Sequence, residues 1–352
     1  MRFSEIPGWS DDNPVEALYA FQRSCARMST AERADVMGRA CSALDNLPES
    51  PDLDAARAFF ETAFAAYRVV LSDDEGLLTA YYEPVIEGSR TRSEQFSVPL
   101  RARPENYVVI NDDNRPIGFD ADLTAARRTA DGLEPWPTRR EIDAGALDGV
   151  AEPLVWIADP VNAFFVHIQG STRIALAEGG TMRVGFAGRN GHPYTSVGGV
   201  MMARGLRPKG GFSMDGMRAF FRDNPQLARE LMHENRSYIF FREVEGLDDE
   251  LGPVGAQGVP LTTQRSLAVD PDFHRLGTPI FIDARLPTGP DRREQRFQKL
   301  MVAQDVGSAI KGPARGDLFW GTGDEAGSIA GGIKSPASFY LLLPQGGDWA
   351  GS

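Results

Sequence analysis

Short strand-like segments separated by turn signals constrain the fold of this 352-residue chain more than any other feature. Closely spaced strands of this kind are typical of antiparallel barrels or sandwiches, whereas a parallel sheet needs a helix between successive strands. The pattern therefore predicts two β-rich units and excludes regularly alternating strands and helices. The candidate strands are Leu154–Ile157, Ala163–Ile168, Thr172–Leu176, Thr181–Phe186, Tyr238–Phe241, Ser266–Val269, Pro279–Ile282, Leu300–Gln304, Asp317–Trp320 and Phe339–Leu343.

The first 70 residues follow a helical pattern instead. Ser29 and Glu32 have the spacing of a capping box, in which each side chain accepts a hydrogen bond from a free amide of the first turn. Ser50 followed by Pro51 predicts the start of another helix, because proline is favoured at the first helical position. A helical interlude is also expected over 213–235. The sequence thus predicts a mainly β protein with N-terminal helices.

The chain has two cysteines, Cys25 and Cys41, and both lie in helical patterns. Two cysteines are too few for a disulfide framework, so two buried thiols are the favoured interpretation. The alternative is a single bridge between neighbouring helices, which would indicate an oxidising compartment. The segment from Met1 to Asn13 has neither a basic region nor an apolar core of an export signal. We therefore expect either a cytoplasmic protein or a mature form whose signal has been removed.

Charge and motif spacing argue against several function classes. With 37 basic and 49 acidic residues, the net charge of −12 repels nucleic acids and anionic membrane surfaces. No apolar run approaches the length of a membrane span. The four histidines lack metal-ligand spacing, and Gly321–Gly327 departs from a dinucleotide-binding loop by one residue. Ser308–Lys311 matches the S-x-x-K of some serine enzymes but has no accompanying K-T-G. We expect no metal and no cofactor.

Two aspartates, Asp305 and Asp317, lie at or beside candidate strands in a segment rich in glycine. Glycine allows a ligand to approach the backbone closely, and Phe319 and Trp320 offer flat faces of the kind on which sugar rings stack. A carboxyl group that loses solvent among such residues has a raised pKa. This pattern is typical of a general acid that stays protonated near neutral pH.

A second interpretation of the same segment remains open. One aspartate can cap a glycine-rich turn while the other pairs with Arg315 or Lys311. The residues alone therefore predict a carboxylate-containing cleft and go no further.

Three motifs elsewhere in the chain resemble those of the membrane-bound lytic transglycosylase A (MltA) family. The segment 78–84 reads L-T-A-Y-Y-E-P, 159–171 begins D-P and ends F-F-V-H-I-Q-G-S, and 183–194 reads R-V-G-F-A-G-R-N-G-H-P-Y. The C-terminal part resembles the 3D domain, named for three aspartates, which here are Asp270, Asp305 and Asp317.

The resemblance implies two domains. Residues 1–102 and 237–352 would form a double-psi β-barrel domain that carries the N-terminal helices. Residues 103–236 would form an inserted, barrel-like β-rich domain, with the active cleft between the two. It also implies peptidoglycan glycan strands as the substrate, further partners among cell-wall synthesis or division proteins, and a monomer. The location would be the periplasm, with outer-membrane association as an option.

The family's chemistry implies roles for individual residues. A lytic transglycosylase cleaves the β-1,4 bond between N-acetylmuramic acid and N-acetylglucosamine, and the C6 hydroxyl of the muramic acid attacks C1 to leave a 1,6-anhydro ring. By the match to R-x-D-x-F-x-G, Asp317 would be the catalytic acid and then base, Asp305 would tune or orient it, and Asp270 would be structural or secondary. The expected saccharide-binding residues are Thr79, Tyr81, Gln169, Ser171 and Lys311.

Two rival functions stay open. A glycoside hydrolase would use Asp305 and Asp317 as a pair of carboxylates. An inactive module would bind peptidoglycan without cleaving it, because one fold can serve several functions.

Overall fold

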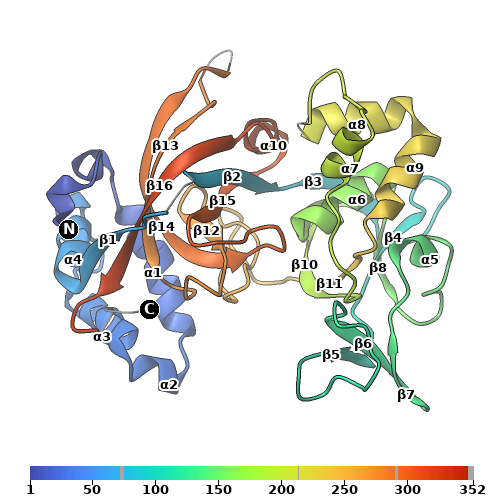
Figure 1. Ribbon diagram of the computed structural model, residues 1–352, viewed down its shortest axis with the longest axis horizontal. Helices are drawn as coiled ribbons and strands as arrows, with labels where there is room; N and C mark the ends of the chain where they lie inside the picture. Colours follow the sequence, from blue (N-terminus) through green and yellow to red (C-terminus); the bar gives the residue numbers. More distant parts are fainter. Residues whose placement is uncertain (72–74, 213, 290–291, 348–352) are drawn as a thin grey trace. The chain divides into compact units, whose positions relative to one another are not determined.

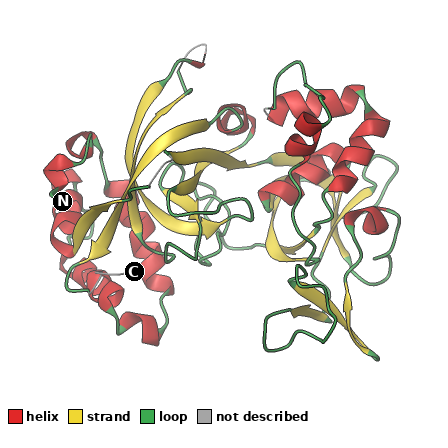
Figure 2. Ribbon diagram, in the orientation of Figure 1, coloured by secondary structure: helices red, strands yellow, loops and turns green. Residues whose placement is uncertain are grey.

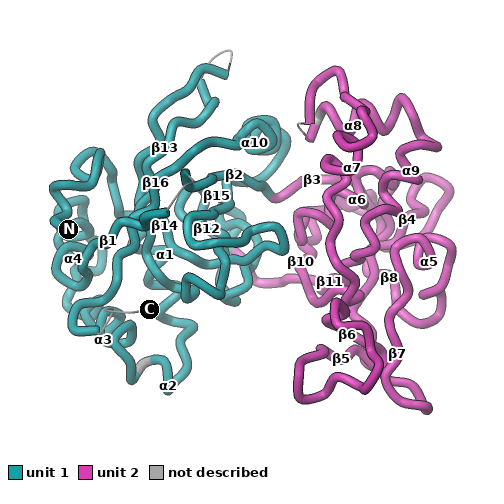
Figure 3. The backbone as a smooth tube through the Cα atoms, viewed as in Figure 1, with its two compact units in different colours: residues 1–82, 248–352 teal, residues 83–247 magenta. Residues whose placement is uncertain are grey.

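The computed structural model describes residues 1–71, 75–212, 214–289 and 292–347. Contacts between Cα atoms divide the chain into two units, each with its own sheet and core (Figure 3). Unit 1 comprises residues 1–82 and 248–352, and unit 2 comprises residues 83–247. The polypeptide therefore leaves unit 1 once, builds unit 2, and returns.

Capping residues set where the N-terminal helices of unit 1 begin, and one predicted helix start is corrected. Ser29 and Glu32 form the predicted capping box. The helix predicted to start at Ser50 begins instead at Leu53, because the Asp52 carboxylate accepts a hydrogen bond from the Ala55 amide at 2.8 Å and serves as the N-cap. The helices of unit 1 are α1 (Val15–Arg27), α2 (Thr30–Arg33), α3 (Val36–Ser42), α4 (Leu53–Ala63) and α10 (Asp324–Ala330), with 3-10 turns at Phe3–Glu5, Trp9–Asp11 and Ala43–Asn46.

A disulfide joins α1 to α3. Cys25 and Cys41 are bonded, with their Cα atoms 5.5 Å apart. The favoured expectation of two buried thiols was therefore wrong, and the single bridge between neighbouring helices is present. The two helices pack together because each buries an apolar side in the same cluster, which brings the cysteines within bonding distance.

Unit 1 is built around a closed barrel of six strands among the residues described, with β1 added outside (Figure 1). The order is β1-β16-β13-β14-β12-β15-β2, and β2 also pairs with β16 to close the ring. Gly76 allows this closure, because a Cβ there would lie 2.4 Å from the Ala337 carbonyl oxygen. The strands are β1 (Phe64–Arg68), β2 (Gly76–Glu83), β12 (Ser266–Val269), β13 (Pro279–Leu286), β14 (Gln295–Val306), β15 (Arg315–Thr322) and β16 (Lys334–Pro344).

The two faces of the barrel wall bury different clusters. Leu267, Leu318 and Phe339 point into the barrel and fill it with apolar side chains. Phe281 and Val302 point outward and pack against α1, α3 and α4, which cover that side of the wall (Figures 1 and 2). The mainly β architecture with N-terminal helices is thus confirmed.

Unit 2 contains a six-stranded sheet and a separate three-stranded sheet among the described residues. The larger sheet has the order β11-β10-β9-β3-β8-β4, and a bridge from Ala102 to Phe241 links its two edges. Because β3 and β4 precede residue 103 and β11 follows residue 236, unit 2 extends beyond 103–236 at both ends. Its strands are β3 (Val85–Ser89), β4 (Val98–Arg101), β5 (Tyr107–Val109), β6 (Ala125–Thr129), β7 (Gly132–Pro135), β8 (Pro153–Ile157), β9 (Ser171–Leu176), β10 (Thr181–Arg189) and β11 (Ile239–Glu243).

One predicted strand of unit 2 is a helix. Residues 163–168 belong to α6 (Pro160–Gln169), which has Asp159 as its N-cap, proline at its first position, and Gly170 in the left-handed region at its end. The segment is buried on several sides, so its apolar run has no helical periodicity and looks like a buried strand. The other helices are α5 (Arg139–Asp143), α7 (Val197–Ala203), α8 (Met214–Asp223) and α9 (Pro225–Glu234).

Among the helices in the described part of the chain, none combines the length and the apolar character needed to cross a membrane.

Candidate active site

Asp305 and Asp317 project from the same face of the barrel wall. Asp317 on β15 pairs with Ala268 on β12, and Asp305 on β14 pairs with the same Ala268 from the other side. Register partners on neighbouring strands point to the same face of a sheet. The two Cα atoms are therefore about two strand spacings apart, roughly 10 Å. The carboxyl groups lie on the outer face, away from the packed interior.

A β-bulge in β14 determines where Asp305 points. Leu267 pairs with Ala303, but the next residue, Ala268, pairs with Asp305, so Gln304 is an inserted residue. Ala303 points into the barrel, and strict alternation would send Asp305 to that interior as well. The extra residue reverses the alternation, as bulges do beside functional sites. Asp305 consequently shares the outer face with Asp317.

Thr79 connects Arg315 to Asp317. The Arg315 Nη2 group donates to Thr79 Oγ1 at 2.8 Å, and Thr79 Oγ1 donates to Asp317 Oδ1. A hydroxyl group has a single hydrogen, so accepting from the guanidinium directs that hydrogen toward the carboxyl. No donor from the described residues reaches the second oxygen of Asp317, Oδ2. That oxygen is available to carry a proton.

Burial raises the pKa of the Asp317 carboxyl above its ordinary value. The hydrogen bond from Thr79 and the positive charge of Arg315 oppose this rise, and the negative charge of Asp305 adds to it. The side chain is half-buried. Desolvation thus favours the neutral acid, while the hydrogen bond and the guanidinium support the carboxylate once it forms.

Asp305 is held through both carboxyl oxygens. Its Oδ2 accepts from the Tyr81 hydroxyl at 2.7 Å, and its Oδ1 accepts from the amides of Ala256 at 2.9 Å and Val306 at 3.0 Å. Burial raises the pKa of the Asp305 carboxyl, and these three hydrogen bonds oppose the rise. Burial and the neighbouring Asp305 charge raise the pKa of the Tyr81 hydroxyl well above its usual value. Tyr81 therefore remains a donor to Asp305.

The two aromatic residues after Asp317 differ in burial. Phe319 is fully buried and lies against Tyr81, with 5.5 Å between ring centroids. Trp320 packs on the interior cluster of the barrel beside Phe297. The expectation of an open face for a sugar ring was therefore wrong for Phe319, whereas Trp320 is only partly buried and its role stays a prediction.

Asp270 and Lys311 form a separate ion pair. Asp270 is buried and accepts from the Gly312 amide at 2.8 Å and from Lys311 Nζ at 3.1 Å. These hydrogen bonds lower the pKa of its carboxyl. Asp270 thus holds the loop that precedes β15, and its structural or secondary role stays a prediction. Lys311 also lies 3.5 Å from Asp272 and has no bond to Asp305 or Asp317.

The other two expected saccharide-binding residues belong to unit 2. Gln169 ends α6, and Ser171 begins β9 and is buried. In unit 1 the structure brings together Thr79, Tyr81, Asp305 and Asp317. Their role in saccharide binding stays a prediction, as does that of Lys311.

Two site groups were missed in the sequence. Arg315 was considered only as an ion-pair partner of an aspartate, yet it contacts Thr79. Its position two residues before Asp317 places both on one strand face, which is the signal that points to it. The Ala256 amide lies in a loop 49 residues before Asp305, and no local pattern marks it.

The described residues contain no group of three or more His, Cys, Asp or Glu side chains that could hold a metal ion.

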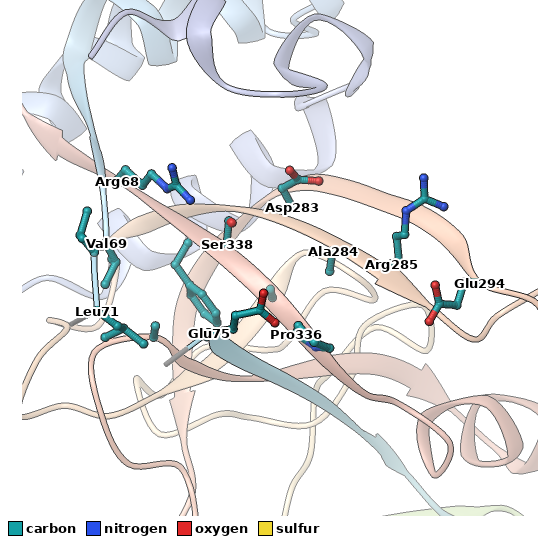
Figure 4. A pocket seen from close by; sticks show the side chains of 15 residues that line it. Arg68, Val69, Leu71, Glu75, Asp283, Ala284, Arg285, Glu294, Pro336 and Ser338 are labelled. Atoms are coloured by element: carbon teal, nitrogen blue, oxygen red, sulfur yellow. The ribbon is translucent and has the colours of Figure 1, made fainter. Parts of the chain in front are cut away.

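A pocket of about 590 Å³ opens elsewhere on unit 1 (Figure 4). Its lining includes Ala284 and Ala337 together with the charged side chains of Arg68, Glu75 and Arg285. None of the Thr79, Tyr81, Asp305 or Asp317 side chains lines it. We assign the candidate site to the aspartates, because among the residues that the structure describes only Asp305 and Asp317 are carboxyl groups with raised pKa values, and they lie on one face.

Family models match most of the chain. The model described as the MltA specific insert domain matches residues 77–242, and the 3D domain model matches residues 265–343. A curated relative, membrane-bound lytic murein transglycosylase A of Escherichia coli K12, is 31% identical over 268 residues. The alignment covers 75% of this chain and spans 64% of the length of that relative.

Solved structures match over nearly the whole chain. The membrane-bound lytic murein transglycosylase from Agrobacterium tumefaciens has a TM-score of 0.87 and 35% identity, covering 98% of this chain and 97% of that one. E. coli MltA with bound chitohexaose has a TM-score of 0.68 and 26% identity, covering 95% of this chain and 90% of the other.

Proposed function

The chain belongs to the MltA family of lytic murein transglycosylases, and on that premise we propose that it cleaves peptidoglycan without water. The bond broken is the β-1,4 link between N-acetylmuramic acid and N-acetylglucosamine, and the product carries a 1,6-anhydro ring. The chitohexaose bound to E. coli MltA supports a glycan chain as the ligand.

Asp317 is the general acid of the proposed reaction. Burial raises the pKa of this carboxyl and so favours its protonated form, and because Thr79 donates to Oδ1, we place the proton on Oδ2. From there it passes to the glycosidic oxygen as the bond to C1 breaks. The leaving sugar departs as an alcohol, and Asp317 becomes a carboxylate.

The same Asp317 carboxylate then acts as the base. The C6 hydroxyl of the muramic acid attacks C1, and its proton returns to Asp317, which restores the acid. Thr79 and Arg315 stabilise the intermediate carboxylate by a hydrogen bond and by positive charge. The cycle consumes no water and leaves the protein unchanged.

The observation that carries the proposal is the difference between the two aspartates. Both Asp305 oxygens accept hydrogen bonds from Tyr81 and from backbone amides, whereas none of the described residues donates to the second oxygen of Asp317. A retaining or inverting hydrolase needs a second carboxylate that is free to attack C1 or to activate water. Asp305 is a poor candidate for either task. Its charge instead raises the pKa of Asp317.

We place the reaction in the periplasm, because peptidoglycan lies outside the cytoplasm and the curated relatives are named as membrane-bound. Thr79 and Tyr81 would line the saccharide site in unit 1, and Lys311, six residues before Asp317, would be a further contact. Gln169 and Ser171 belong to unit 2, and their contact with a glycan stays a prediction.

The test is mass spectrometry of purified sacculi digested with the protein and with Asp317→Asn, which keeps the shape but cannot donate the proton. Asp324→Asn is the matched control, since Asp324 is exposed and lies seven residues further along. We expect anhydro-muropeptides from the wild type and from Asp324→Asn, and none from Asp317→Asn.

Binding of chitohexaose to Asp317→Asn by calorimetry shows whether that variant keeps its site. Products with free reducing ends would establish the two-carboxylate hydrolase instead. Binding to sacculi without any product from the wild type would establish the inactive binding module.

A further inference from the structure

Gln304, the inserted residue of the bulge, is fully buried, and both polar atoms of its side chain form hydrogen bonds. Its Nε2 group donates to the Ala20 carbonyl oxygen and to Ser24 Oγ, both at 2.8 Å and both on α1. Its Oε1 accepts from Ser266 Oγ on β12 at 2.5 Å. The side chain thus ties β14 to a helix on one side and to the neighbouring strand on the other.

The backbone of Gln304 is bound as well, to the loop that supports Asp305. Its carbonyl oxygen accepts from the Gln257 amide at 3.1 Å, next to the Ala256 amide that donates to Asp305. Gly255 permits this approach, because a Cβ there would lie 2.5 Å from the Gln304 oxygen. Ser24 Oγ also lies 2.8 Å from Gln257 Oε1, so helix, bulge and loop form one network.

A bulge loses hydrogen bonds of the strand ladder and needs other partners to persist. The buried amide of Gln304 finds them in Ala20, Ser24 and Ser266, which satisfies its polar atoms away from water. Without these partners, the regular register would send the Asp305 side chain into the apolar interior of the barrel or release it to solvent.

We propose that Gln304 is a positioning residue: it locks the one-residue bulge and thereby holds the Asp305 carboxyl between Tyr81 and the Ala256 amide, beside Asp317. The effect on rate rests on the proposed function. The effect on Asp305 itself does not, and it can be measured in a protein without activity.

The kinetic test is a double-mutant cycle between Gln304→Leu and Asp305→Asn, read as the initial rate of anhydro-muropeptide release. We expect Gln304→Leu to lower the rate about 10- to 100-fold, because a small misplacement of a site group costs this much. In the Asp305→Asn background, the same change should cost less than about two-fold. An equal loss in both backgrounds would overturn the proposal, since Gln304 would then act independently of Asp305.

Gln298→Leu is the matched control, because Gln298 is a half-buried glutamine of the same strand, bound to Asp283 at 2.9 Å. It should leave the rate within about two-fold of the wild type. Ser24→Ala removes one partner of Gln304 and is the milder variant if Gln304→Leu fails to fold. It should lower the rate in the same direction by a smaller factor.

The measurement that is independent of activity is the titration of the Asp305 carboxyl, followed by carbon-13 NMR of protein labelled at aspartate. In Gln304→Leu, or in Ser24→Ala to a smaller extent, we expect the pKa of this carboxyl to shift: release to solvent lowers it toward the ordinary value, and a turn into the apolar interior without the three hydrogen bonds raises it further. Gln298→Leu should leave it in place. An unchanged pKa of Asp305 in folded Gln304→Leu would refute the positioning role, whether or not the wild type cleaves peptidoglycan.

Discussion

Thr79→Val is the substitution that tests the proposed chemistry most directly. Valine keeps the β-branched shape that suits strand β2 and removes only the hydroxyl group. That group accepts from Arg315 at 2.8 Å and donates to Asp317, so the variant loses both hydrogen bonds without opening a cavity. The reaction would still have its acid, but the carboxylate formed after the first proton transfer would lose a donor.

The size of the effect follows from the kind of bond. A hydrogen bond to a charged group contributes about 1.5–3 kcal/mol. If it stabilises the carboxylate in the transition state, its loss lowers kcat roughly 10- to 150-fold, at 1.36 kcal/mol for each factor of ten. Thr79 also opposes the burial that raises the pKa of Asp317, so removing it raises that pKa further. The rate needs the protonated acid, and the alkaline limb of the pH–rate profile should therefore move to higher pH.

The assay is the initial rate of anhydro-muropeptide release, measured across pH for the wild type, Thr79→Val and Thr79→Ser. Serine keeps the hydroxyl and should retain most of the rate and the position of the alkaline limb. The reasoning would be refuted if Thr79→Val kept its rate within about two-fold of the wild type and its alkaline limb did not move.

Three further predictions concern stability. Asp12→Ala should lower the free energy of unfolding, measured in urea, by about 3–5 kcal/mol. The buried Arg265 would lose the carboxylate that it contacts through two nitrogens at 2.8 Å. A loss below about 1 kcal/mol would contradict this. Replacing both Cys25 and Cys41 by serine should lower the free energy of unfolding by about 3 kcal/mol in the same assay, since the disulfide closes a short loop with a sequence separation of 16. An unchanged unfolding midpoint would contradict this prediction. Gly327→Ala should lower the melting temperature, because a Cβ would lie 2.6 Å from the buried Tyr82 ring, whereas Gly205→Ala, with open space around it but a positive φ, tests the backbone cost alone.

Local sequence signals were sufficient where neighbours along the chain decide the structure. The capping box at Ser29 and Glu32 forms as predicted, since both partners lie within one turn. The strand candidates from Ser266 onward all lie within β12 to β16. The strand predicted over 163–168 was wrong, because burial on several sides of α6 removes the periodicity that distinguishes a helix from a strand. The state of Cys25 and Cys41, free thiols or a disulfide, stayed open for a related reason. The packing of α1 on α3 cannot be deduced from the sequence of either helix alone.

The sequence by itself determined the central chemical groups of the site, which are two aspartates among glycines, but Arg315 was considered only as an ion-pair partner. It could not decide which way Asp305 points, because side-chain alternation is fixed only relative to a register, and the bulge at Gln304 depends on partners in α1, β12 and a distant loop. Nor could it join Thr79 to Asp317 across 238 residues, since that contact exists only when β2 closes the barrel beside β15. The sequence therefore gives the types of residue in the site. The arrangement of Thr79, Asp305 and Asp317 depends on the pairing of strands that are distant in the sequence, and only the packed tertiary structure sets that pairing.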